Sequence, residues 1–568
     1  MSAEFDVRSI PFSTRGAWLN ISPVIGLHQY AEDLHLVSHR GGLTPILRLR
    51  PSSEDAFVEP TIEATSSVLT WKSQDGRIEA VFDGPERLRL RGRSLNLRLD
   101  CAAPELTPFS GMFLYLDPVT QDYVFTSYET GRRYRTTVHQ GTLTVEGAGA
   151  LGRAVRSLTV TGPGDGWEIL IEETTSSRPG TVIASSFDDA VRGSQETFAA
   201  FVEAVAGWRD QRTPAAELAA YVLWSATVAP DGFLGRESVL MSKHWMDKLW
   251  SWDHCFNALA LAGGEPALAL DQFLAPFDHQ TAEGALPDSV THSEILYNYV
   301  KPPIHGWALT ELRSQITDLD RPTLELIRDR LSAWTGFWLD CRRAPGHPLS
   351  YYQHGNDSGW DNATTFDHDR VIESPDLAGF LVLQMDVLAG LEKELGNPDA
   401  ALEWENQAQA MLEALLTLWN GQTFTAHSAL TGDPAATSSL LNLLPVILGD
   451  RLPAGVRESL AQSLKGHLTP WGVATEPPTS PHYHPDGYWR GPIWAPSTVL
   501  IESGLRRAGQ NDLADEVSAS FRRLCETHGF AENFDALTGE GLRDRAYTWT
   551  ASAYLRLAAE WVRRSEVH

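Results

Sequence analysis

The chain contains 568 residues, and its 46 Lys and Arg residues against 73 Asp and Glu residues give a formal net charge of −27. A surface this acidic repels nucleic-acid phosphates and anionic lipid headgroups, so we expect neither nucleic acid nor a membrane as a partner. The sequence has no apolar run of about 20 residues and no basic, apolar N-terminal leader, so we expect a cytoplasmic protein.

Residues 1–205 have the pattern of short strands. The runs at 88–91, 94–100, 155–161 and 167–173 alternate apolar and polar side chains with a period of two. Short strands of this kind, separated by turn residues, predict an antiparallel β-sandwich.

The pattern changes to helical spacing near residue 195 and stays helical to residue 568. The predicted segments lie near 215–229, 253–262, 265–274, 304–316, 322–341, 376–395, 398–419, 436–448, 454–466, 491–508, 511–528 and 547–564. Twelve helices of this length suit a double-layered toroid, the (α/α)6 barrel. An irregular helical bundle or a solenoid is the alternative, but no fixed repeat supports a solenoid. We therefore predict a β-sandwich domain at 1–205 and an (α/α)6-barrel catalytic domain at 206–568.

Tryptophan is concentrated in the helical part, because only Trp18, Trp71 and Trp167 of the 19 tryptophans lie in the first 205 residues. Indole rings give flat apolar faces on which sugar rings stack, although they equally fill a large helical core. Trp252 and Asp253 stand in an aromatic stretch just before a predicted helix. Asp253 is therefore either a helix N-cap or part of a sugar subsite.

The polar loops that follow contain further candidate binding residues. Gln280 opens a polar loop, and Lys301 precedes two prolines that favour an extended backbone, so its ammonium could point at a ligand. The alternative for Lys301 is a surface lysine at a helix start. His354, Asn356, Trp360 and Asn362 belong to the densest polar cluster of the chain.

That cluster contains two candidate acids, Asp357 and Asp361. An aspartate next to Trp360 loses solvent, which raises its pKa and keeps it protonated for general acid catalysis. An Asx-rich turn and a calcium loop are the alternatives, but the spacing of the oxygens does not match the twelve-residue calcium loop.

The last candidate residues lie before the final helices. Trp489 and Arg490 occur in a stretch rich in Tyr and Trp, where the arginine fork could clamp hydroxyls or simply stack on a ring. Glu532 is a candidate general base, and Trp549 opens the last helix. Asp361 and Glu532 together fit glycosidic bond hydrolysis, which needs one protonated carboxyl and one ionised carboxylate.

In their shared order along the chain these loops resemble glycoside hydrolase family 63 and related (α/α)6 glycosidases. That group includes processing α-glucosidase I, bacterial α-glucosidases and mannosylglycerate or glucosylglycerate hydrolases. The matching stretches are Trp252–Asp253, Lys301–Trp307, Ser358–Asn362, Tyr488–Trp494, Glu532–Gly539 and Thr548–Thr550.

The resemblance implies an inverting mechanism in which Asp361 is the general acid and Glu532 the general base. It also implies that Trp252, Asp253, Trp489 and Arg490 hold the non-reducing sugar. The sequence departs from the family pattern around the base, where Ala531 and Phe534 replace two expected tyrosines. Family members often carry a β-sandwich before the toroid, and we expect this one to pack against it and contribute part of the pocket wall.

The main functional hypothesis is an inverting exo-α-glucosidase that releases glucose from a short α-glucoside. A hydrolase of glucosylglycerate or mannosylglycerate is an alternative, although some of these enzymes lack an N-terminal domain. An epimerase or isomerase on the same toroid is the alternative from another class; it would depend on paired histidines such as His254, His305, His354, His482 and His484. A binding protein with an inactive site is a further alternative.

We expect a small carbohydrate substrate and neither a cofactor nor a metal ion. The four cysteines are far apart and form no metal-ligand or disulfide pattern: Cys101, Cys255, Cys341 and Cys525. The sequence does not indicate the oligomeric state.

Overall fold

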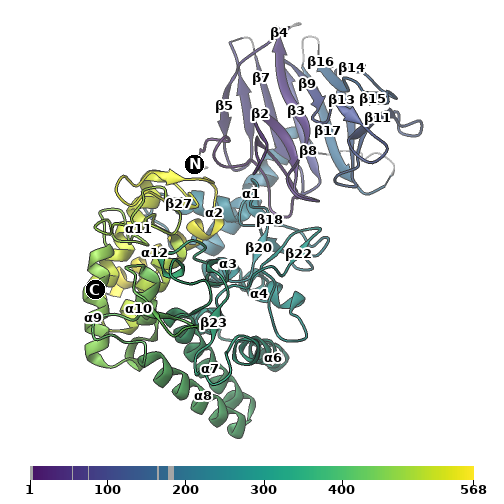
Figure 1. Ribbon diagram of the computed structural model, residues 1–568. Coiled ribbons are helices and arrows are strands. Elements are labelled where there is room, and N and C mark those ends of the chain that lie inside the picture. Colours follow the sequence, from purple (N-terminus) through teal and green to yellow (C-terminus); the bar gives the residue numbers. More distant parts are fainter. Residues whose placement is uncertain (1–3, 54–55, 75, 163–165, 177–184, 568) are drawn as a thin grey trace. The chain divides into compact units, whose positions relative to one another are not determined.

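The computed structural model describes residues 4–53, 56–74, 76–162, 166–176 and 185–567 (Figure 1). These residues form two compact units. One contains the chain up to Glu203 with the segments Ala220–Lys248 and Thr291–Ser293, and the other contains Ala204–Ala219, Leu249–Val290 and the chain from Glu294 onward. The predicted order, antiparallel sheets followed by helices, is confirmed. No helix of the described ranges has the length and hydropathy to cross a lipid bilayer.

The first unit is built on two antiparallel sheets. One has the strand order β1-β2-β3-β9-β16-β14 with β4 paired to β3, and the other has the order β11-β12-β13-β17-β8-β7-β6-β5. The strands are β1 (Leu19–Ile25), β2 (Tyr30–Ser38), β3 (Thr44–Ser53), β4 (Ala56–Phe57), β5 (Thr61–Ala64), β6 (Leu69–Lys72), β7 (Arg77–Phe82), β8 (Arg87–Arg93), β9 (Asn96–Cys101), β10 (Glu105–Leu106), β11 (Met112–Leu116), β12 (Tyr123–Ser127), β13 (Arg133–Gln140), β14 (Thr142–Glu146), β15 (Gly152–Arg153), β16 (Ser157–Thr161) and β17 (Trp167–Thr174).

The alternation of apolar side chains explains how these strands build a core. Leu97 and Leu99 of β9 are fully buried, whereas the intervening Arg98 is half-buried and pairs with Asp100. Ile169 and Ile171 of β17 lie in the same cluster of buried side chains. Each strand therefore gives one face to a common apolar core, as its period of two predicts.

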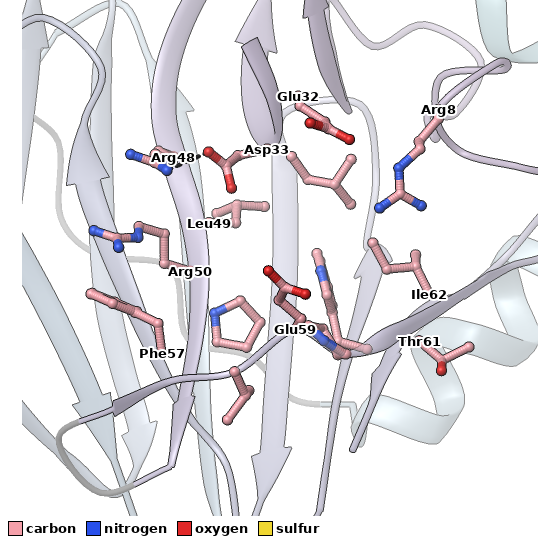
Figure 2. A pocket seen from close by; sticks show the side chains of 15 residues that line it. Arg8, Glu32, Asp33, Arg48, Leu49, Arg50, Phe57, Glu59, Thr61 and Ile62 are labelled. Carbon is pink, nitrogen blue, oxygen red and sulfur yellow. Dashed lines mark ion pairs between the residues drawn. The ribbon is translucent and has the colours of Figure 1, made fainter.

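Residues from strands of both large sheets line a groove of about 690 Å³ (Figure 2). Arg48 and Arg50 of β3 line it, together with Asp33 and Phe57. Arg48 forms an ion pair with Asp33, and the Arg50 guanidinium lies 3.3 Å from the centre of the Phe57 ring. None of the predicted site residues lies in this groove.

The second unit is helical, and the predicted helices agree closely with those observed. The helices of the chain are α1 (Phe187–Ala206), α2 (Ala216–Ala226), α3 (Asp253–Leu261), α4 (Pro266–Leu274), α5 (His305–Arg313), α6 (Arg321–Gly336), α7 (Pro375–Leu395), α8 (Pro398–Leu416), α9 (Ala454–Leu464), α10 (Ala495–Arg507), α11 (Asn511–His528) and α12 (Thr548–Val567). The segment predicted near 436–448 is instead a 3-10 helix, η5 (Leu440–Arg451). Pro445 lies inside it and cannot donate a backbone hydrogen bond, which disfavours a regular α-helix there.

The helices pack in a consistent order. Helix α3 contacts α5, α5 contacts α7, α7 contacts η5, η5 contacts α10, α10 contacts α12, and α12 contacts α3 again. Helices α4, α6, α8, α9 and α11 pack against members of this closed series. The loops before α3, α5, α7, α10 and α12 contain most of the candidate site residues, and the loop before α7 contains five of them.

Short two-residue strands in these loops fix the connections. They are β18 (Thr227–Val228), β19 (Ser238–Val239), β20 (Leu249–Trp250), β21 (Ser289–Val290), β22 (Ile295–Leu296), β23 (Tyr351–Tyr352), β24 (Ile372–Glu373), β26 (Pro434–Ala435), β27 (Asn533–Phe534) and β28 (Gly541–Leu542), with the three-residue β25 (Ala426–Ser428).

Candidate active site

Asp253 is the first residue of α3 and is buried, with 4% of its surface exposed. The N-cap position is Trp252 and has no side-chain cap bond, so Asp253 does not act as the N-cap. Its Oδ2 atom is buried without a hydrogen-bond partner. Burial raises the pKa of Asp253 to about 8, although the positive charge of Lys301 opposes that shift. Such a group is suited to meet a ligand hydroxyl.

Lys301 joins three carboxyl groups into one electrostatic cluster. Its Nζ lies 3.1 Å from Asp288 Oδ1 and donates a hydrogen bond to the Asn356 carbonyl at 2.8 Å. Burial alone would lower its pKa, but the charges of Asp361, Asp288 and Asp253 raise the pKa of Lys301. Lys301 is therefore a buried cation of the site, not a surface lysine.

Asp361 and Asp357 have different surroundings. Asp357 is fully buried and accepts hydrogen bonds from Arg342 Nη1 at 2.7 Å and from the backbone N–H groups of Gln353 and Val300. Its two oxygens are thus occupied by structural partners. Asp361 is less buried. Desolvation still raises the pKa of Asp361, although the positive charge of Lys301 opposes that shift. Of the two candidate acids, Asp361 is the one suited to proton donation.

Glu532 lies at the start of the β27–β28 ribbon and is 1% exposed. Its backbone N–H donates to the Asp544 carbonyl at 2.8 Å, while its Oε2 atom is buried without a hydrogen-bond partner. Burial and then the charge of Asp544 raise the pKa of Glu532 to about 8, against the effect of Arg543.

The pKa values of two tyrosines, Tyr488 and Tyr547, report which carboxyl groups lie near them. Burial and then the charges of Glu532 and Asp361 hold the pKa of Tyr488 well above its ordinary value. Burial, Glu532 and Asp253 do the same to the pKa of Tyr547. Because charge effects fade with distance, these shifts indicate that Asp253, Asp361 and Glu532 belong to one site.

Indole rings surround these carboxyl groups. Trp489 and Trp494 are stacked with ring centres 4.0 Å apart, and Trp360 lies 4.7 Å from Trp489. The ring centre of Trp252 lies 6.4 Å from that of Trp489 and 6.0 Å from that of Trp549. The Trp549 indole N–H donates a hydrogen bond to the Glu532 backbone carbonyl at 3.3 Å. The arrangement combines flat apolar faces with carboxyl groups, which suits a sugar ring.

Three of the predicted binding residues are engaged in holding loops together. Asn362 donates to the Gly487 carbonyl at 3.0 Å and accepts from the Trp489 N–H at 3.0 Å. Arg490 donates to the Asn362 carbonyl at 2.6 Å and forms an ion pair with Asp367. The Gln280 amide donates to the Gly284 and Arg330 carbonyls. Their direct contact with substrate stays a prediction.

Three of the histidines of the alternative isomerase hypothesis bond backbone groups: His305, His254 and His354. His305 is fully buried, bonds the Ser251 carbonyl at 3.0 Å, and has its pKa lowered to about 3 by burial. His254 is also buried and bonds the Trp250 carbonyl. His354 stacks on Tyr299 and accepts from the Asn356 N–H. Within the described ranges, no group of three or more His, Cys, Asp or Glu side chains is arranged to hold a metal ion.

Sequence reasoning did not assign roles to Asp288, Tyr488, Tyr547, Arg543 and Asp544. Asp288 ends the polar loop that begins at Gln280, and Tyr488 belongs to a stretch quoted for the family resemblance, so both had a local signal. Arg543 and Asp544 had none, because they reach Glu532 only through the pairing of β27 with β28.

Comparison with known proteins decides the family. A family model described as the mannosylglycerate hydrolase MGH1-like glycoside hydrolase domain matches residues 246–550, which is more than half of the chain. The chain belongs to this family of glycoside hydrolases. The predicted resemblance to the family 63 glycosidases is thereby confirmed, and the protein is a glycosidase.

Two relatives are mannosylglycerate hydrolases. The chain is 32% identical over 166 residues to that of Thermus thermophilus, which aligns 28% of this chain with 38% of that protein. It is 25% identical over 407 residues to that of Rubrobacter radiotolerans, which aligns 55% of this chain with 90% of that protein. The first of these alignments thus spans well under two thirds of the Thermus protein.

Solved structures show the fold. The family 63 mannosylglycerate hydrolase of Thermus thermophilus, in complex with Tris and D-glycerate, is 21% identical with a TM-score of 0.53 and covers 60% of this chain and 98% of its own. A bacterial glucoamylase in complex with acarbose is 11% identical with a TM-score of 0.67 and covers 99% of this chain and 95% of its own. The MGH1-like domain therefore has a helical fold of the glucoamylase kind.

Proposed function

We propose that this protein is an inverting hydrolase of a small glycoside of glycerate, such as mannosylglycerate or glucosylglycerate. The observation that supports the proposal is that the half-buried Asp361 and the buried Glu532, two carboxyl groups of raised pKa, both act on the pKa of Tyr488 within a tryptophan-rich region. The named activity of the relatives supports the glycerate glycosides. The activity of these relatives favours a glycerate glycoside over the α-glucoside of our main sequence-based hypothesis. It outweighs the observation that some hydrolases of glycerate glycosides lack an N-terminal domain.

In the proposed reaction Asp361 donates its proton to the glycosidic oxygen as the bond to the anomeric carbon breaks. A water molecule attacks that carbon from the opposite face, and Glu532 takes a proton from this water. The products are glycerate and a free sugar of inverted anomeric configuration. The two carboxyl groups then exchange a proton with solvent to restore the starting state.

The remaining site residues would bind and orient the sugar. Trp252 and Trp489 are buried among other indoles and would form the apolar wall behind the sugar, and Asp253 would accept a hydrogen bond from one of its hydroxyls. Lys301 would hold the surrounding carboxyl groups in position, since its ammonium contacts both Asp288 and the Asn356 carbonyl.

We also propose that the helices form an (α/α)6 barrel. The closed series α3, α5, α7, η5, α10 and α12 would be its inner layer, with α4, α6, α8, α9 and α11 as five of the six outer helices. Asp253 at the start of α3, Trp494 at the N-cap of α10 and Trp549 in the first turn of α12 support this assignment. They would all lie at one end of the barrel.

Early-time proton NMR tests the proposed function. The panel would contain mannosylglycerate, glucosylglycerate, kojibiose, nigerose, maltose, isomaltose and trehalose, with free glucose and mannose as controls. We expect the β-anomer of mannose or glucose to appear first from a glycerate glycoside. An initial α-anomer would contradict the role of Glu532 as the base. Hydrolysis of only the disaccharides would support the α-glucosidase hypothesis instead. A free sugar that changes while every glycoside stays intact would indicate an isomerase.

A further inference from the structure

The ribbon β27–β28 brings Arg543 to the side of Glu532. Asn533 pairs with Leu542 in this ribbon, and the Glu532 N–H donates to the Asp544 carbonyl. The turn of the ribbon thus places residues that are about ten positions apart next to each other. Arg543 follows β28 directly, at the end of the ribbon where Glu532 precedes β27.

The Arg543 guanidinium has three partners there. Its Nη1 donates to Asn533 Oδ1 at 3.0 Å, and its Nη2 lies 2.8 Å from Asp486 Oδ1. Its central carbon lies 4.8 Å from the centre of the Tyr488 ring. A planar fork can make these contacts together, because it bonds in its plane and stacks on its face. Arg543 therefore ties the ribbon to the loop that carries Tyr488.

Arg543 and Tyr488 share a backbone conformation that is rare for residues other than glycine. Among the residues that the structure describes, four non-glycine residues have a left-handed φ, and these include Tyr488 at 64° and Arg543 at 61°. L residues with side chains rarely adopt this conformation, and the surrounding contacts must hold it in place. Here two such residues stack on each other beside one buried carboxyl group.

We propose that Arg543 is a positioning residue for Glu532. Arg543 acts through its charge, which favours the ionised form of the carboxylate, and through the Tyr488 ring, which keeps the carboxylate aimed. The inference rests on the proposed role of Glu532 as the base. A base that works by taking a proton from water must be ionised, and a buried glutamate without a hydrogen-bond partner on Oε2 resists ionisation. A fixed positive charge beside it counteracts that resistance.

The charges around Glu532 agree with this role. Burial and Asp544 raise the pKa of Glu532, whereas Arg543 and a hydrogen bond from Tyr488 lower it. Asp361 also raises it, and Tyr547 is a further titratable group that faces Glu532. Asp544 belongs to the same ribbon as Arg543, so one hairpin supplies two opposing charges.

Two substitutions break the same ion pair and separate charge from structure. Arg543→Met removes the positive charge, so we expect the low-pH limb of the kcat/KM profile to move up by about half a pH unit or more. Asp486→Asn leaves the Arg543 charge without its counterion, so we expect that limb to stay in place or move down. Arg543→Lys, which keeps the charge, should bring the limb back towards the wild-type position. Arg545→Met removes the same charge two positions away and should leave the limb unchanged.

Infrared titration of the carboxyl band that disappears in Glu532→Gln reads the same protonation without turnover. We expect the midpoint of this band to rise in Arg543→Met and not in Asp486→Asn. Equal shifts in both variants, or no shift in Arg543→Met, would overturn the inference. A wild-type protein that hydrolyses no glycoside of the panel would instead contradict the proposed function, and the infrared midpoints would still decide the electrostatic effect of Arg543.

Discussion

Two carboxyl groups of the site are held in surroundings that disfavour their charge. Glu532 and Asp253 are 1% and 4% exposed, and each has one buried oxygen without a hydrogen-bond partner. The buried carboxylate of Asp357 differs from them, since it accepts three hydrogen bonds. Polar groups that are buried and left unsatisfied lower stability, so they are expected where a ligand or reaction makes use of them.

Replacement of Glu532 by Gln should stabilise the protein at pH 8. The pKa of Glu532 in the folded state, about 8, lies above the value near 4.3 of an unfolded glutamate. Folding therefore requires uptake of a proton between these values, so stability is lost as pH rises through this window and the full cost is present above pH 8.

We expect Glu532→Gln to gain about 1–3 kcal/mol of unfolding free energy at pH 8 and about half a kcal/mol or less at pH 4.5, where the folded state is protonated and the unfolded glutamate is about half ionised. Thermal unfolding at the two pH values measures the difference. An equal gain at both pH values would show that packing, not charge, is responsible.

Asp361 and Asp357 form a matched pair for mutation to asparagine. Asp361→Asn should lower kcat by about 10²–10⁴-fold while sugar binding and the melting temperature stay close to wild type, because the proton donor is lost. Asp357→Asn should instead lower the melting temperature, since it removes the charge that pairs with Arg342 at 2.7 Å. Steady-state kinetics and thermal melts distinguish them; wild-type turnover in Asp361→Asn would remove it as the acid.

At the scale of elements, the helices could be predicted and the tertiary contacts of their loops could not. The 3.6-residue spacing of apolar side chains found α3, α7 and α11 within one residue of their observed bounds. The strands β8, β9, β16 and β17 followed equally from a period of two. In contrast, the bonds from Asn362 to Gly487 and Trp489 link loops that are more than 100 residues apart, and no local pattern encodes them.

The same limit applies to the candidate site. Motif resemblance selected Asp361 and Glu532, but only the structure relates them to Asp288, Tyr488 and Arg543. The occupied amide of Gln280 is also invisible in the sequence, because its partner Arg330 lies 50 residues further along. Residue types and order were therefore predictable, whereas the division between binding and loop support was not.

The loop that carries Asp361 should be sensitive to a methyl group at Gly359. This glycine has a φ of 73°, and an added Cβ would lie 2.5 Å from the Trp252 ring. We expect Gly359→Ala to displace Trp252 and reduce kcat/KM by about tenfold or more.

Gly346→Ala is the matched control for this prediction. Gly346 has a φ of 82° but open space around the added Cβ, so it shares the backbone strain without the collision. Kinetics of both variants provide the measurement. Equal losses in the two variants would show that general destabilisation, not the position of Trp252, limits activity.

At the scale of the whole molecule, the β-sheet unit includes chain from well beyond its last long strand. The segment Ala220–Lys248 belongs to it. Lys243 is buried there and donates to Ser13 Oγ at 2.9 Å, and Asp247 accepts from His39 at 2.9 Å. The change of periodicity near residue 195 does not indicate that residues 220–248 belong to the β-sheet unit. A domain boundary at residue 205 would separate Lys243 and Asp247 from Ser13 and His39.

A fragment of residues 1–248 should consequently unfold at a higher temperature than a fragment of residues 1–205. The shorter fragment lacks Asp247, which bonds His39, and Lys243, which bonds the Ser13 hydroxyl. It also lacks Asp231, which pairs with Arg40 at 2.8 Å. Thermal melts followed by far-ultraviolet circular dichroism compare the two. Identical melting temperatures would mean that the returning segment adds nothing to the stability of the sheets.

The stacked indoles of Trp489 and Trp494 have an optical consequence. Two parallel rings with centres 4.0 Å apart and an interplanar angle of 6° couple their electronic transitions, which produces a paired band of opposite signs in the ultraviolet spectrum of a chiral molecule. Both indoles are 1% exposed, so we expect a sugar bound at the neighbouring carboxyl groups to change this coupling only by shifting the rings around the pair. The enzyme thus contains its own spectroscopic reporter, and occupancy of the site is readable in the inactive Asp361→Asn variant without any label.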